Sequence, residues 1–168
     1  MRSLLSPLLL ATALVAACAS YDGSSLRPGA SGDEVKQLMG APAAIYPSAQ
    51  SGLGGQRWAY PRGPAGLHTY MARIDASGRL SGIDQVLDQA FFAQLRIGQD
   101  RQSEVQALLG PHWISAYFER RKELVWTWRF RNAWGNAAQL HVTFDEAGLV
   151  KRYEQIEEDR GRRRWDID

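Results

Sequence analysis

Apolar and polar residues alternate in the C-terminal half of the chain as they do in β-strands. Between residues 122 and 130 the apolar side chains recur at every second position, at Leu124, Trp126, Trp128 and Phe130. The same alternation recurs over residues 140–144. A turn at Asp145–Gly148 then leads into a further alternating segment, 150–156. These patterns predict antiparallel strands joined by short turns.

Two other segments have apolar positions at helical spacing, with start and stop signals. The first begins at Ser31, and Glu34 three residues later completes a capping box that can satisfy free amides at a helix start. It ends at Gly40, where a helix commonly terminates. The second helix is expected to be capped by Asp100 and to end at Gly110.

The helix and strand motifs occur twice, in the same order, at a separation of 68 to 70 residues. The corresponding pairs are Leu26-Arg27-x-Gly29 with Leu95-Arg96-x-Gly98, Glu34-Val35 with Glu104-Val105, Trp58-x-Tyr60 with Trp126-x-Trp128, and Asp75-x-x-Gly78 with Asp145-x-x-Gly148. We therefore predict two copies of one unit, 24–87 and 88–157, followed by a charged tail over 158–168. Each copy would place one or two helices on one face of an antiparallel sheet, which is an α+β fold. In the second copy, residues 88–95 are expected to supply the additional amphipathic helix.

The N-terminal segment has the pattern of a secretory signal peptide. One positive charge at Arg2 precedes an apolar run, which is too short to cross a bilayer and ends in small residues. Leu14-Val15-Ala16-Ala17 before Cys18 resembles the bacterial lipobox. We therefore expect residues 1–17 to be removed, Cys18 to be lipidated and residues 18–25 to form a tether. The alternative is an ordinary secretory signal that leaves Cys18, the single cysteine of the chain, as a free thiol.

Composition and motifs offer little support for catalysis. The formal net charge is only +2, so no strong field would attract nucleic acid. The three histidines, His68, His112 and His141, lack metal-ligand spacing, and no serine lies in a nucleophile elbow. We expect no enzyme activity, cofactor or metal. The basic tail segment 160–164 is interpreted as a solvated end or as a contact with lipid headgroups or an acidic partner.

The second copy resembles the BamE (SmpA/OmlA) family of small outer-membrane lipoproteins along nearly its whole length. The motifs are Leu95-Arg96-Ile97-Gly98, the helix end Leu108-Leu109-Gly110-Pro111, the Trp-x-Trp strand, and Val142-Thr143-Phe144-Asp145-x-x-Gly148. The chain departs from the family in having two units and in carrying Gly98-Gln99-Asp100 where the family has Gly-Met-Thr. A tandem of this unit also resembles the β-lactamase inhibitor protein, whose concave sheet binds an enzyme. The resemblance implies a fold more firmly than a partner.

Three aromatic residues are our candidates for partner binding: Trp113, Tyr117 and Trp134. Trp134 is predicted at a loop tip, where it has little to pack against, and the other two flank the first strand of the second unit. The aromatic face of strand 122–130 is interpreted as core beneath the helices, with an open aromatic platform as the alternative.

The resemblance and the predicted anchor together imply a lipid-anchored protein on the periplasmic side of the bacterial outer membrane. Its partners would be outer-membrane assembly proteins or another periplasmic protein. The alternative function is inhibition of a periplasmic enzyme through one concave surface formed by both sheets.

Overall fold

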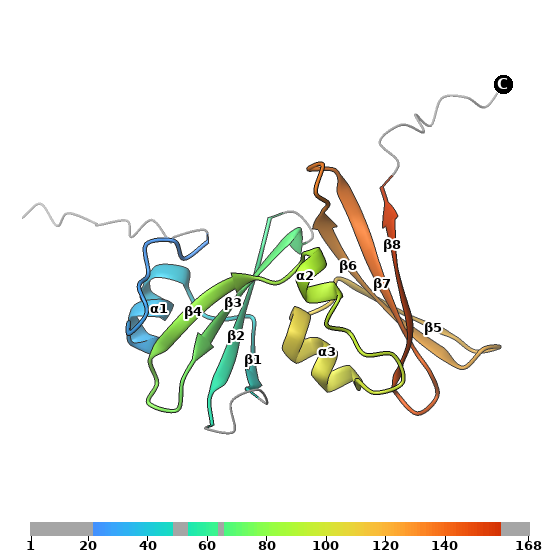
Figure 1. The fold of residues 1–168 in the computed structure, drawn as a ribbon, viewed down its shortest axis with the longest axis horizontal. Coiled ribbons are helices and arrows are strands. Elements are labelled where there is room, and N and C mark those ends of the chain that lie inside the picture. Colours follow the sequence, from blue (N-terminus) through green and yellow to red (C-terminus); the bar gives the residue numbers. More distant parts are fainter. Residues whose placement is uncertain (1–21, 49–53, 64–65, 159–168) are drawn as a thin grey trace, which may run out of the picture.

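The computed structural model describes residues 22–48, 54–63 and 66–158, which form two four-stranded antiparallel sheets and three helices (Figure 1). Cys18 and the charged tail beyond Glu158 lie outside the described residues. The first sheet has the order β1-β2-β3-β4 and the second the order β5-β6-β7-β8. Each is therefore a meander in which neighbours in sequence are also neighbours in space.

The first half of the chain begins with helix α1 (Gly32–Met39). The predicted capping box is present: the Glu34 amide donates to Oγ of Ser31 at 3.2 Å, and the Ser31 amide donates to the Glu34 carboxylate at 2.7 Å. The helix ends at Gly40, which has a φ of 83°. The four strands that follow are β1 (Ala44–Pro47), β2 (Gln56–Arg62), β3 (His68–Ile74) and β4 (Leu80–Gln85).

The second half begins with α2 (Gln89–Phe92), which is shorter than the helix predicted over residues 88–95 and is capped by Asp88. Helix α3 (Gln102–Leu109) corrects the prediction that Asp100 caps it, because Arg101 occupies the N-cap position. The Asp100 carboxylate instead accepts from the backbone amide and the guanidinium of Arg96, both at 2.8 Å. The carboxylate that was expected to cap the helix therefore lies one residue before the N-cap and is bound to Arg96.

The second sheet consists of β5 (Ile114–Phe118), β6 (Glu123–Arg131), β7 (Ala137–Phe144) and β8 (Val150–Glu157). Its inner face confirms the predicted core: Trp126, Trp128 and Phe130 are each at most 7% exposed. They pack with apolar residues of α2, α3 and the neighbouring strands. The open aromatic platform, our alternative for this face, is therefore wrong.

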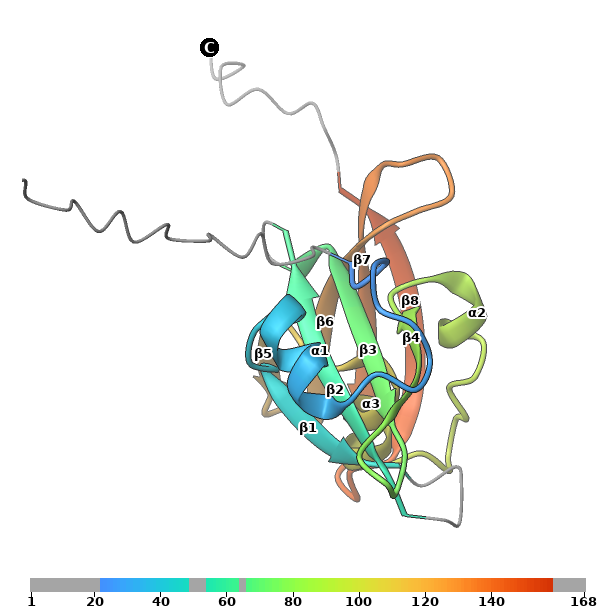
Figure 2. The same cartoon turned by 90° about the vertical axis from the view of Figure 1, so that its left-hand side faces the viewer.

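The layers run in the order α1, first sheet, α2 with α3, second sheet (Figures 1 and 2). Gly110, at the end of α3, shows how closely they pack. Its carbonyl accepts from Nε1 of Trp128 in the second sheet at 3.2 Å. On its other side, a Cβ added to Gly110 would lie 2.8 Å from Cγ2 of Thr69 in the first sheet.

This packing corrects two expectations. The first sheet is covered on both faces, by α1 on one and by α2 and α3 on the other, rather than on one face only. The two sheets also do not form one concave surface, because the helices of the second half lie between them. The cause is apolar surface on the second face of the first sheet, where Ala59, Met71 and Val86 are fully buried and contact Phe91 of α2.

Candidate binding surfaces

The face of the second sheet that points away from α2 and α3, here called the outer face, is covered by no helix of the described residues. Residues directly opposite each other in an antiparallel pair share a face. The pairs Ile114 with Thr127, Ala116 with Val125 and Phe118 with Glu123 therefore all lie on the outer face. Ile114 is 45% exposed and Phe118 is 42% exposed, so this face presents apolar side chains to solvent.

Strand β5 is the edge of the second sheet, and every one of its residues is exposed. An edge strand leaves a row of backbone N–H and C=O groups unpaired by its own sheet. Apolar side chains at Ile114 and Phe118 flank those groups. Such an edge can accept a strand from another protein, with pockets for alternate side chains supplying specificity.

Trp113 lies immediately before β5 and belongs to the outer face. The guanidinium carbon of Arg129 lies 5.1 Å from the centroid of its ring, in the range of a cation–π contact. Arg129 is itself paired with the carboxylate of Glu158. Trp113 remains 45% exposed, so it is oriented by Arg129 without being covered.

Trp134 occupies the tip of the β6–β7 hairpin and is 86% exposed. The hairpin is ordered by Asn132, whose side-chain oxygen accepts from the amides of Trp134 at 3.0 Å and Asn136 at 2.9 Å. Gly135 takes the positive φ of 74° that the turn requires. The turn thus holds a large aromatic side chain in solvent, as expected for the loop tip.

The structure does not bring the three candidate aromatic residues together. Tyr117 pairs with Leu124 and therefore points to the inner face, whereas the ring of Trp113, which precedes β5, contacts Arg129 on the outer face. The hairpin that carries Trp134 begins after Arg131, about 23 Å at the rise of a strand from Leu124 opposite Tyr117, and about 13 Å from Thr127, whose carbonyl accepts from the Trp113 amide. Trp113 can thus contribute to one site with Ile114 and Phe118, whereas Tyr117 and Trp134 lie elsewhere.

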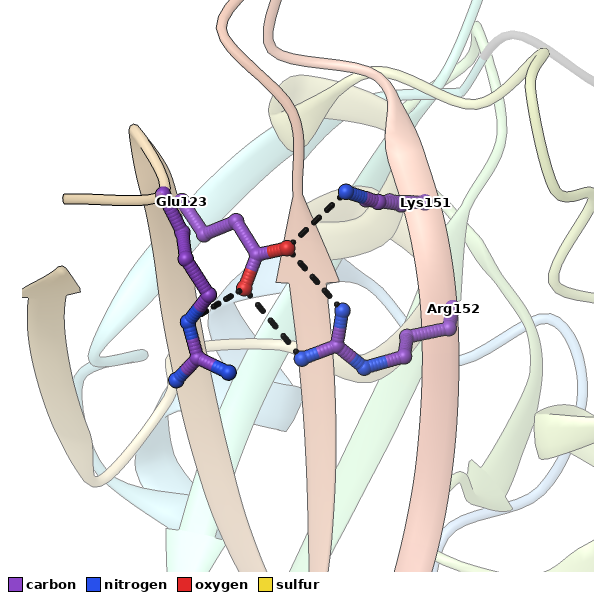
Figure 3. A network of polar contacts seen from close by, with 4 residues as sticks. Glu123, Lys151 and Arg152 are labelled. Atoms are coloured by element: carbon purple, nitrogen blue, oxygen red, sulfur yellow. Dashed lines mark hydrogen bonds and ion pairs between the residues drawn. The ribbon is translucent and has the colours of Figure 1, made fainter.

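A network of charges lies on the outer face at the Glu123 end of β6 (Figure 3). The Glu123 carboxylate accepts from Lys151 at 2.9 Å and from both terminal nitrogens of Arg152 at 3.1 and 3.3 Å. Arg121 approaches the same carboxylate at 3.5 Å. The side chain of Glu123 is only 4% exposed, whereas those of Lys151 and Arg152 are 52% and 41% exposed.

These cations hold the pKa of Glu123 at about 2, through hydrogen bonds from Arg152 and then Lys151, which outweigh the effect of desolvation. Glu154 lies close enough to Arg152 to help raise the pKa of that guanidinium. Three partly exposed cations and two carboxylates therefore leave this end of the outer face with a net positive charge.

This network could not be predicted from the sequence, because it depends on a β-bulge. Thr143 pairs with Arg152, but the next residue, Phe144, pairs with Val150, so Lys151 is an extra residue in β8. The bulge allows the consecutive residues Lys151 and Arg152 to reach the same carboxylate, which regular alternation would prevent. The adjacent basic residues in the sequence were the available signal, but alternation alone places them on opposite faces.

The histidines occupy separate positions. Nδ1 of His141 lies 2.9 Å from Oγ1 of Thr127 on the outer face, while His112 stacks on Trp126 with ring centroids 4.3 Å apart. Burial lowers the pKa of His112, and His68 has its pKa lowered by burial and by Arg131. Within the described ranges, no group of histidine, cysteine and carboxylate side chains could hold a metal ion, and no helix could span a membrane.

No protein-family model matches this chain, and neither does any curated protein. A crystal structure of a proposed β-lactamase inhibitor protein from Streptococcus mutans is similar over 82% of this chain and 89% of that one, at 14% identity and a TM-score of 0.30. The described residues themselves form a mixed α/β structure with two four-stranded antiparallel sheets.

Proposed function

We propose that this protein is a non-enzymatic, lipid-anchored protein of the bacterial outer membrane that binds other proteins through the outer face of its second sheet. Within this proposal the chain is a tandem of two BamE-like units. The observation that carries the proposal is the exposed outer face, with its apolar edge strand β5 beside a net positive charge network. Solvent-exposed apolar surface of this kind is typical of protein-binding sites.

Backbone hydrogen bonds, isolated bridges and register shifts that recur at a spacing of about 70 residues support the proposed duplication. The Gly29 amide donates to the Leu80 carbonyl at 2.7 Å, and the amide of Gly98 donates to the carbonyl of Val150 at the same distance. Isolated bridges join Ser31 to Arg79 and Arg101 to Leu149. Each sheet also has a register shift at the matching place, between Arg73 and Ile74 and between Thr143 and Phe144. Because bulges tend to persist within families, the matched positions favour two copies of one ancestral unit.

The proposed anchor keeps the domain close to a membrane. Cys18 and Asp22, the first described residue, are four residues apart, which is at most about 14 Å of extended chain. A tether of this length raises the effective concentration of the domain for any partner in the same membrane. Tethering is therefore part of the function that we propose.

The partner that best suits the outer face is a protein surface with apolar and acidic side chains. Outer-membrane assembly proteins are the leading class, and a soluble periplasmic enzyme inhibited by this protein is the alternative. Either class would use β5 and the outer face, since the structure provides no concave surface shared by both sheets.

The test is site-specific photo-crosslinking in cells, with the crosslinking residue placed at Phe118 on the outer face or at Ile97 as a control. Ile97 is 56% exposed and lies outside the second sheet. We expect a strong crosslink to outer-membrane assembly proteins from position 118 and little from position 97. The combined change Ile114→Asp and Phe118→Asp should abolish rescue of a deletion strain, assayed by detergent sensitivity, whereas Ile97→Asp should rescue fully.

Two results would contradict the proposal: equal crosslinking from both positions, or full rescue by the outer-face double variant at normal abundance. A soluble periplasmic enzyme captured from position 118, with its activity reduced by the purified chain, would replace the assembly role with the inhibitor role. Circular dichroism and an unchanged unfolding midpoint would show that the double variant is folded.

A further inference from the structure

A cleft of about 750 Å³ lies between Pro47 and Arg57 of the first sheet on one side and α3 with the segment 93–100 on the other. Its apolar wall includes Pro47 of β1 together with Ala107 and Leu108 of α3. Arg57 of β2 also lines the cleft, and it is only 7% exposed. A guanidinium that is buried beside apolar side chains requires a compensating negative charge or hydrogen-bond acceptors.

Arg57 has no such compensation among the described residues. Its Nε is buried and has no hydrogen-bond partner. Burial lowers the pKa of Arg57, and the charge of Arg73, which lies directly opposite in β3, lowers it further. Arg57 thus faces a like charge from within its own sheet.

The carboxylates of Asp100 and Glu104 also line the cleft, but both are already bound by other residues. Asp84 is paired with Arg73, and the Asp100 carboxylate is held by the backbone and side chain of Arg96. The carboxylate of Glu104 accepts from the backbone amide of Arg101 at 2.6 Å. The segment 49–53, which connects β1 to β2, reads Ala-Gln-Ser-Gly-Leu and contains no acidic residue.

We propose that the cleft is a binding site for a carboxylate with a short apolar stem, in which Arg57 pairs with the carboxylate and Ala107 and Leu108 contact the stem. The planar guanidinium can donate two parallel hydrogen bonds to a carboxylate, and burial strengthens them. The carboxylate belongs either to a free carboxylic acid or to an acidic side chain of a partner protein. This site lies between the two sheets and is separate from the outer face.

The test uses the purified full chain and measures the thermal midpoint together with the ¹⁵N-labelled arginine Nε–H resonances. The probes are hexanoate and its neutral analogue hexanamide, and a doubly capped tripeptide with a central Asp and its Asn analogue. We expect a saturable rise in the midpoint and a shift of the Arg57 resonance with a carboxylate probe, and neither change with the neutral analogues. A response to hexanoate alone assigns the site to free carboxylic acids, and a response to the Asp peptide alone assigns it to protein side chains.

Arg57→Met removes the charge while keeping an unbranched side chain, and it should weaken carboxylate binding at least tenfold. The ligand-free midpoint should stay unchanged or rise, because an unpaired buried charge is lost. Arg120→Met, the same change in the exposed β5–β6 turn, should bind as the unmodified chain does. Ala107→Phe, which narrows the cleft and leaves Arg57 in place, is the second variant and should also weaken binding.

Undiminished binding by both cleft variants would overturn the proposal, as would the absence of any response to either carboxylate probe. Equal responses to hexanoate and hexanamide would also overturn it, because they would show that the charge of Arg57 plays no part.

Discussion

Gly110 and Gly40 form a matched pair that tests the contact between the two halves of the molecule. Each ends an eight-residue helix, and each donates its amide to the carbonyl four residues earlier at 2.8 Å. Their backbone angles are nearly equal, with φ of 78° and 83° and ψ of −169° and −172°. They differ in their surroundings: a Cβ on Gly40 would meet nothing within 4 Å, whereas one on Gly110 would lie 2.8 Å from Cγ2 of Thr69.

The two alanine variants should therefore differ in stability by the cost of that contact. Replacing glycine in this backbone conformation lowers the free energy of unfolding by about 1–3 kcal/mol. Gly40→Ala and Gly110→Ala both incur this backbone cost. Gly110→Ala also overpacks a site where Thr69 is fully buried, which adds about 1–3 kcal/mol. We expect Gly110→Ala to lower the free energy of unfolding by about 2–6 kcal/mol, and Gly40→Ala by the shared backbone part alone.

The assay is urea unfolding of the full chain, followed by tryptophan fluorescence and circular dichroism. Thr69→Ser removes the methyl group that the new Cβ would meet, so the double variant Gly110→Ala/Thr69→Ser should recover about 1–2 kcal/mol relative to the sum of the single changes. The same serine change should show no coupling to Gly40→Ala. If both alanine variants lost equal stability and Thr69→Ser coupled to neither, the packing of α3 against the first sheet would be refuted.

Three further outcomes are expected. Because its cations hold the pKa of Glu123 at about 2, below the ordinary 4.5, this carboxylate stabilises the fold above about pH 4.5, and the contribution is lost as the pH falls toward 2. The difference in unfolding free energy between the unmodified chain and Glu123→Gln, from urea titrations, should therefore shrink over that range; a constant difference would contradict the assignment. Trp134→Ala should change stability by no more than about 0.5 kcal/mol, since the side chain is 86% exposed, and should leave capture of native partners in pull-downs unchanged, because Trp134 lies apart from the outer-face site; reduced capture would extend the interface to the hairpin. Leu140→Ala, at a fully buried position of the second sheet, should cost about 2–5 kcal/mol in chemical denaturation, and a cost below 1 kcal/mol would argue against the core described above.

Interactions that are close in sequence were the predictable part of the fold. The Ser31–Glu34 capping box and the end of α1 at Gly40 involve residues within one or two helical turns. The alternation over residues 122–130 placed the correct side chains in the core, because a strand has only two faces and one of them must be buried. Asp100 was the local exception, since two partners compete for its carboxylate and the sequence does not rank them.

The candidate binding residues were predictable only in part. The exposure of Trp134 followed from its place in a turn between two strands. The separation of Trp113 from Tyr117 did not, because positions four residues apart in a regular strand share a face, and only the contact with Arg129 places the Trp113 ring on the outer face. The Glu123 network depends on a bulge in β8, a one-residue irregularity that leaves no clear trace in the hydrophobic pattern.

The sequence by itself determined the two longer helices, the order of helices and strands, and the aromatic core of the second sheet, since these follow from periodicity and from local hydrogen bonding. Only the tertiary structure decided that α2 and α3 lie between the two sheets, because that arrangement depends on apolar surface on both faces of the first sheet and on the missing side chain of Gly110. In the sequence, Arg57 is one charged residue among others in a strand. The packing of the two halves buries it at the wall of a cleft. Burial and charge pairing depend on contacts between residues that are distant along the chain. The packing of the two halves therefore determines which side chains are buried and which charges are paired.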